Sequence, residues 1–168
     1  MSGSRGQTPA EAAAARTSWR QVSQVPDVAP AESIELTSLR GLREVRRRVR
    51  AVLTASLDDG DELDEVVRED VVERVVLVID ELASNAVRHG APPATLEVRE
   101  TGEHWVVVVT DAAPDALPAP AVDRPAGQGG YGLYVIADLA TAHGVEVHGD
   151  RKQVWARLAK PGPRSPTD

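Results

Sequence analysis

A polar stripe marks the segment 81–90, which ends a strongly apolar helical sequence. Glu81, Asn85 and His89 follow one another at steps of four residues, with Arg88 beside them. Because a step of four in an α-helix turns the side-chain direction by only about 40°, the three side chains share one face. A carboxylate on a buried helix is costly unless it has a partner or a wet cavity. The stripe therefore indicates either a ligand-facing wall or a capped, ion-paired helix end in which His89 interacts with the helix dipole.

Two further features flank the segment 112–130, which is dominated by Ala, Pro and Gly. Asp111 ends an apolar strand just before it, where a carboxylate can accept a hydrogen bond from a ligand's exocyclic amine or simply serve the turn. At the other end, the glycine-rich run 127–132 opens a helix, and such helix starts bind phosphate groups. The run matches neither the dinucleotide-binding fingerprint nor the P-loop. A structureless stretch of this length is often an active-site lid, so the three signals together favour a ligand site.

The elements that must position these residues follow from hydrophobic periodicity and turn residues. Strands are predicted at 33–36, 94–100, 104–111, 145–148 and 153–158. Helices are predicted from a Thr37 or Ser38 cap to about 57, from 63 or 68 to 88, and from 131 to 142 with Gly144 as a stop. This order predicts an α/β sandwich, an α+β fold with helices on one face of a largely antiparallel sheet.

Composition narrows the class of protein. The chain has 168 residues, no cysteine, four scattered histidines and a net charge of −7. These values exclude disulfides and cysteine zinc sites, and they argue against a bulk nucleic-acid binder. No apolar run approaches the roughly 20 residues of a membrane span, and no signal-peptide core is present. We therefore expect a cytoplasmic protein that does not bind membranes.

The chain divides into one predicted domain and two tails. Residues 1–17 are predicted to be disordered because they lack sustained apolar periodicity, and 161–168 because this short tail carries three prolines. Residues 18–160 form the predicted domain. Six arginines between Arg40 and Arg50 fill the polar faces of the first helix. They indicate a solvated face, or else a docking face for an acidic partner. Trp105 and Trp155 indicate strand packing more than stacking on a ligand.

At the polar stripe, the strand-end aspartate and the glycine run, the chain resembles the GHKL (Bergerat-fold) ATPases, and within them small actinobacterial anti-sigma-factor serine/threonine kinases. The segment from Glu81 to Gly90, ELASNAVRHG, is similar to the N-box of that family. The resemblance implies that Asn85 holds Mg²⁺, that Glu81 is the general base, and that Asp111 binds the adenine amino group of ATP. It implies further cofactor-binding residues around these: Arg88, His89, Gly127, Gly129, Gly130, Tyr131, Gly132 and Leu133.

The chain departs from that family at two places. The first glycine box of the family continues with two glycines after the aspartate, but here Ala112, Ala113 and Pro114 follow Asp111. The loss of both glycines stiffens the turn and is expected to weaken nucleotide binding or to change the motion of the lid. The family strand near the C-terminus often carries a threonine beside the adenine, and Gln153 stands at the position where we expect it.

The resemblance implies a kinase that phosphorylates a small antagonist protein, sequesters a sigma factor, or does both, with a possible homodimer. The alternative is a non-catalytic partner-binding module with a degenerate nucleotide site, because the sequence after Asp111 is altered. A sensor histidine kinase is disfavoured because none of the four histidines lies in a dimerisation helix. The topoisomerase, chaperone and mismatch-repair branches are disfavoured because no transducer domain follows.

Overall fold

A five-stranded antiparallel sheet carries the fold. The computed structural model describes residues 24–58, 63–120 and 131–162, together with Thr8, Ala10 and Trp19. The strand order is β1-β2-β3-β5-β4, and every neighbouring pair is antiparallel. The strands are β1 (Pro30–Leu36), β2 (Ala94–Glu100), β3 (His104–Asp111), β4 (Ala142–His148) and β5 (Arg151–Ala159).

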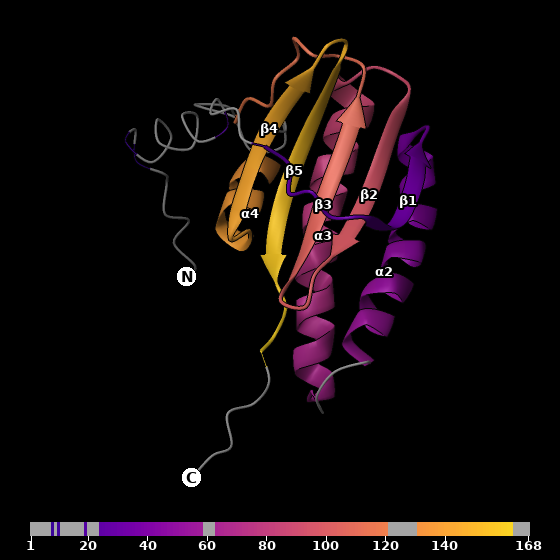
Figure 1. Cartoon of the computed structure of the whole chain (residues 1–168), viewed down its shortest axis with the longest axis vertical. Helices are drawn as coiled ribbons and strands as arrows, with labels where there is room; N and C mark the ends of the chain where they lie inside the picture. Colours follow the sequence, from indigo (N-terminus) through magenta and orange to yellow (C-terminus); the bar gives the residue numbers. More distant parts are fainter. Residues whose placement is uncertain are drawn as a thin grey trace, which may run out of the picture.

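The helices cover one face of this sheet (Figure 1). They are α2 (Leu42–Asp58), α3 (Glu65–His89) and α4 (Gly132–Leu139), and a short 3-10 turn, η1 (Leu39–Gly41), leads into α2. Helix α3 lies behind the middle strands and contacts α2 on one side and α4 on the other. The α+β sandwich with helices on one face is confirmed. The sequence predicted a largely antiparallel sheet, and in the structure all of the strand pairings are antiparallel.

Side-chain caps begin η1, the turn that leads into α2, and the long helix α3. Ser38 accepts a hydrogen bond from the N–H of Gly41, which makes it the N-cap of η1. Asp64 does the same for α3 by accepting from the N–H of Val66. Asp64 satisfies an N–H at the first turn of α3, and Ser38 fixes the start of the 3-10 turn that leads into α2.

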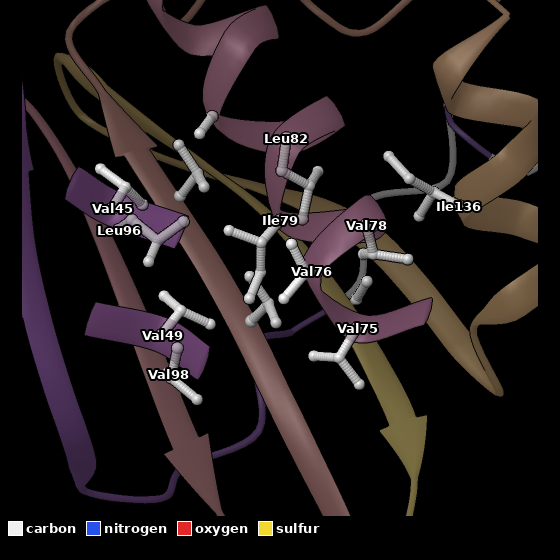
Figure 2. Packing of buried hydrophobic residues seen from close by; sticks show 14 of the residues in the cluster. Val45, Val49, Val75, Val76, Val78, Ile79, Leu82, Leu96, Val98 and Ile136 are labelled. Carbon is white, nitrogen blue, oxygen red and sulfur yellow. The ribbon is translucent and has the colours of Figure 1, made fainter. Parts of the chain in front are cut away.

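The core lies between the helices and the inward face of the sheet. Figure 2 shows side chains of α2, α3, β2 and α4 meeting in one layer: Val45, Val49, Val75, Val76, Val78, Ile79, Leu82, Leu96, Val98 and Ile136. All of them are buried and all are aliphatic. Helix α3 buries its inward face from Val72 to Ala86 because α2, α4 and the sheet contact it there, which explains its apolar centre.

The other face of the sheet is crossed by an extended segment, residues 24–29, which we call the N-terminal strap (Figure 1). Its Val25 packs against the buried cluster of Val106, Val108 and Trp155. The N–H of Val25 donates to Glu146 on β4 over 2.6 Å. At the next residue of the strap, the Pro26 carbonyl accepts from an Arg99 N–H. The strap therefore shields the outward side chains of β3 and β5.

The arginines of α2 are largely paired with acidic side chains. Arg46 contacts Asp80 of α3 at 2.7 Å, and Arg47 pairs with Glu44. Arg48 pairs with Glu32 of β1, and Arg50 with Glu73 of α3. These contacts neutralise much of the positive charge, which favours a solvated face over a docking face for an acidic partner.

The third predicted helix is the main correction. It was predicted to run from 131 to 142, but α4 ends at Leu139 because Ala140 takes an extended conformation. The next residue, Thr141, donates its backbone N–H to Arg157 of β5, so the chain has already joined the sheet. Gly144 is therefore not a helix stop. It lies within β4, where its cross-strand partner is Trp155.

Several sequence predictions lie outside what the structure describes. The two predicted tails, 1–17 and 161–168, fall almost entirely outside the described residues, as does 121–130 of the predicted lid. The division into a domain and two tails stays a prediction. Within the described part of the chain, no helix is long and apolar enough to cross a membrane.

Truncating Ile79, a side chain of α3 in the core, should measure how much the stability of the fold depends on the packing of this helix. Ile79 is fully buried, and we expect Ile79→Ala to lower the free energy of unfolding by about 2–5 kcal/mol through lost burial and a cavity. Leu77→Ala is the matched control on the same helix, because Leu77 is 43% exposed. Chemical denaturation measures both. An equal loss in the two variants would contradict the central place given to Ile79.

Candidate functional site

A cavity of about 280 Å³ lies where the C-terminal end of α3 meets the ends of β3 and β5. Its wall on α3 includes Asn85 and His89, and its wall on the sheet includes Val109, Asp111 and Val154. The segment 116–119 and Leu133 of α4 close the remaining sides. The lining is largely apolar with a few polar groups, as in sites that bind small organic ligands.

The polar stripe of α3 is split between the cavity and its rim. Asn85 and His89 line the cavity, although His89 is largely exposed. Glu81 is half-buried one turn earlier and is not part of the lining, and Arg88 is exposed. The helix therefore directs the amide of Asn85 and the imidazole of His89 to the cavity, and it places Glu81, the candidate general base, just outside the cavity lining.

Glu81 lies against the first residue of α4. A Cβ placed on Gly132 would be 1.8 Å from Glu81 Oε2 and 2.5 Å from its Cδ. A glycine at this position lets the start of α4 approach the carboxylate closely. The structure thereby brings together Glu81, the candidate general base of the N-box, and a glycine of the glycine-rich run 127–132, 51 positions apart in the sequence.

The environment of Glu81 favours its protonated form. Burial raises the pKa of the Glu81 carboxyl above its usual value, and the charge of neighbouring Asp80 adds to this, while Arg88 opposes it. A carboxylate with a raised pKa is a better proton acceptor than an ordinary glutamate, as a general base requires. Asp80 is itself held by Arg46 of α2.

Asp111 is buried at the floor of the cavity and forms an ion pair there. Only 1% of Asp111 and 4% of Lys152 is exposed, and Lys152 Nζ donates to Asp111 Oδ1 over 2.8 Å. The same oxygen accepts the backbone N–H of Ala113 at 2.9 Å. Lys152 also donates to the Ala113 carbonyl at 3.0 Å. This network satisfies two buried charges, which would otherwise be strongly destabilising.

Gly90 lets the end of α3 approach Asp111. A Cβ placed on Gly90 would lie 2.7 Å from Asp111 Cγ and 2.5 Å from the carbonyl oxygen of Ala86. The next residue, Ala91, accepts a hydrogen bond from the N–H of Ala112, which ties the end of β3 to this turn. The last glycine of the N-box-like segment therefore sets the distance between the α3 wall and the cavity floor.

Sequence reasoning missed Lys152 and chose its neighbour instead. Gln153 stands at the position expected to lie beside the adenine. Side chains alternate along β5, however, and Gln153 contacts Thr110 on the side of the sheet away from the cavity. Lys152 is the cross-strand partner of Asp111 and shares its face. The signal was present in the sequence. Val154, Ala156 and Leu158 mark the inward face of β5, and Lys152 continues that series.

The remaining predicted residues are only partly described. Gly127, Gly129 and Gly130 lie outside the described residues. Tyr131 is 46% exposed and faces Tyr134 with ring centroids 6.4 Å apart, while Leu133 lines the cavity. Among the described residues, no group of three or more His, Asp or Glu side chains could hold a metal ion. Mg²⁺ at Asn85 would therefore take its other ligands from substrate phosphates and water, as it commonly does.

Comparisons with known proteins agree with this architecture. The model of the histidine kinase-like ATPase domain family matches residues 36–158. No curated protein matches the chain.

The solved structures similar to the chain include two that each share 17% sequence identity with it. One is the RsbU and RsbW domains of Rv1364c from Mycobacterium tuberculosis, with a TM-score of 0.51 over 80% of this chain and 35% of that one. The chain thus spans about a third of that protein, and the likeness shows the fold alone. The other is the Acinetobacter baumannii histidine kinase AdeS, with a TM-score of 0.39 over 76% of this chain and 67% of that one.

The close approach at Gly90 should make this glycine sensitive to a single methyl group. We expect Gly90→Ala to lower the free energy of unfolding by about 1–3 kcal/mol, because both the Ala86 carbonyl and the Asp111 carboxylate must move. Gly102→Ala is the control, since nothing lies within 4 Å of a Cβ placed there. Thermal or urea unfolding measures both. Equal stability of the two variants would show that the turn absorbs the methyl group.

Neutralising Glu81 should stabilise the protein in a pH-dependent way. The folded-state pKa of Glu81 is raised, so wild-type stability falls as pH rises through that pKa, and the glutamine variant lacks this loss. We therefore expect the Tm of Glu81→Gln to exceed that of wild type by up to a few degrees at pH 8 and to approach it at pH 4. Scanning fluorimetry across this range measures the difference. A lower Tm for the variant at pH 8 would mean that the charged carboxylate stabilises the fold.

Proposed function

Because the chain belongs to the histidine kinase-like ATPase domain family, we propose that it is a regulatory protein that binds ATP with Mg²⁺ in the cavity between α3 and the ends of β3 and β5. One observation carries the proposal. Asn85 and His89 of α3 and Asp111 of β3 line the same cavity. These are residues for which the family resemblance implies contacts with the cofactor.

The sheet end of the cavity suits a nucleobase. Val109, Leu133 and Val154 provide apolar walls for a planar ring. Asp111 is the acceptor that we assign to the exocyclic amine of adenine. Its two hydrogen bonds among the described residues both fall on Oδ1, which leaves Oδ2 to accept from the ligand. A ring buried here would gain hydrophobic contact on its faces and polar contact at its edge.

The α3 end of the cavity suits the phosphates. Asn85 offers an amide oxygen for Mg²⁺, which would bridge phosphate oxygens and neutralise their charge. Arg88 and His89 are assigned to the phosphates as further donors, and both lie in the last turn of α3. Gly132 begins α4 beside Glu81, so a phosphate group at this helix start would lie near the candidate base.

We further propose that the protein transfers the γ-phosphoryl group to a serine or threonine of a small antagonist protein. The hydroxyl oxygen forms the new bond to phosphorus, the bond to the β–γ bridging oxygen breaks, and ADP leaves. Glu81 accepts the hydroxyl proton, a role supported by its raised pKa and by its place next to Gly132. A sigma factor is the proposed second partner, and a homodimer the proposed assembly, both from the family resemblance.

One observation favours a second candidate function, a partner-binding module that does not transfer phosphate. Lys152 already pairs with Asp111, and Ala112 and Ala113 replace the glycines that the family has after this aspartate. A site altered in this way can keep the nucleotide as a structural ligand or lose it.

Titration calorimetry with MgATP tests the binding site. We expect saturable binding by wild type and a loss of at least about tenfold in affinity for Asn85→Ala, because the amide ligand of the metal is removed. Arg74→Ala is the control on the same helix, since Arg74 is exposed and pairs only with Asp70 among the described residues. Folded wild-type protein that does not bind MgATP would overturn the proposal. Unchanged affinity in Asn85→Ala would overturn the metal role.

Transfer is tested with the Glu81→Gln variant. Wild type and variant are incubated with γ-labelled ATP and an extract of the source cells, and labelled proteins are compared. A labelled band that needs Glu81 supports the kinase and marks its substrate. Binding of ATP without any such band favours the non-catalytic module.

A further inference from the structure

We propose that Lys152 is a specificity-determining residue that reads the adenine ring directly, by donating a hydrogen bond to the ring nitrogen N1 while Asp111 accepts from the 6-amino group. The inference rests on the proposed function, because it assumes that ATP occupies the cavity. It assigns a role to a buried charged side chain that sequence reasoning did not select.

The geometry places a donor and an acceptor side by side at the cavity floor. Lys152 and Asp111 are cross-strand partners on β5 and β3, and Nζ lies 2.8 Å from Oδ1. Both residues line the cavity. Adenine presents the complementary pair on adjacent ring positions, an amino group that donates and N1 that accepts. The paired side chains therefore match one whole edge of this base.

Each of the two groups has hydrogen-bonding capacity left. An ammonium has three N–H donors, and Lys152 uses two of them, on Asp111 Oδ1 and on the Ala113 carbonyl. Among the described residues the third has no partner, and neither does Asp111 Oδ2. A base can thus bind without breaking the ion pair. This removes the need for the ligand to compete with Lys152 for the carboxylate.

The burial of the pair favours N1 over N7, the other ring nitrogen beside the amino group. Asp111 and Lys152 are almost completely buried, so the edge that they contact is the deepest part of the ligand. N7 belongs to the same five-membered ring as N9, which carries the ribose and the triphosphate chain. The phosphates must lead away toward Asn85 and Glu81. N1 is on the far side of the base and enters first.

The charge balance also suits a neutral base. Asp111 and Lys152 cancel each other, so the floor of the cavity carries no net charge from this pair. A hydrogen bond from a charged donor in a buried site is stronger than one between neutral groups. Loss of such a bond is expected to weaken binding by about 10- to 100-fold.

The test compares three nucleotides by titration calorimetry on the intact chain with Mg²⁺. ATP is the reference, 1-deaza-ATP lacks N1, and 7-deaza-ATP lacks N7 and is the matched control. We expect 1-deaza-ATP to bind wild type about 10- to 100-fold more weakly than ATP, and 7-deaza-ATP to bind within about threefold of ATP. Equal binding of ATP and 1-deaza-ATP would overturn the proposal, as would a loss seen only with 7-deaza-ATP.

A variant then assigns the loss to Lys152. In Lys152→Met the side chain keeps a similar length but loses its ammonium donor. We therefore expect the preference for ATP over 1-deaza-ATP to shrink to about twofold or less. A preference that persists in this variant would show that another group reads N1. The comparison of nucleotides on wild type needs no variant, so it decides the proposal even if Lys152→Met does not fold. Absence of any ATP binding by wild type is a different result, because it removes the proposed function itself.

Discussion

Burial of α3 is the constraint on which the rest of the structure depends. The helix contacts α2, α4 and the strands β2, β3 and β5, so the inward side of its middle turns must be apolar, and the run from Val75 to Ile79 is buried except at exposed Leu77. Its last turns keep buried residues such as Leu82 and Ala86 and also carry the polar stripe of Glu81, Asn85 and His89. A single rigid element therefore anchors the core and supplies one wall of the cavity. Side chains on such an element are held more precisely than side chains on loops.

Much of this arrangement was predictable because it depends on local pattern. The strands 94–100 and 104–111 were predicted with the bounds that β2 and β3 have, since both alternate clearly and a Thr-Gly turn joins them. The four-residue spacing of the polar stripe placed Asn85 and His89 on one face. The end of α4 was not predictable in this way. The segment 140–144 has helix-compatible residues, but pairing with β5 decides its conformation.

The interior of the candidate site shows where sequence reasoning reached its limit. Asp111 was selected because it ends an apolar strand, yet its ion-pair partner Lys152 was passed over, and only the next residue of β5, Gln153, was considered for the site. Register decides this choice, since a shift of one residue moves a side chain to the opposite face of the sheet. The glycines are a similar case. Gly90 and Gly132 were chosen as parts of motifs, whereas the structure shows that a neighbouring carboxylate occupies the space of a side chain at each of them.

The N-terminal strap has a consequence for the order of folding. The hydrogen bond from Val25 to Glu146 joins residues 121 positions apart, across nearly the whole described chain. Contacts of such long range form slowly, because closing the intervening loop costs entropy before any contact compensates for it. During synthesis β4 and β5 are the last of the described elements to emerge. The outward cluster of Val106, Val108 and Trp155 therefore stays uncovered until the hairpin of β4 and β5 has docked and the first part of the chain can return across it.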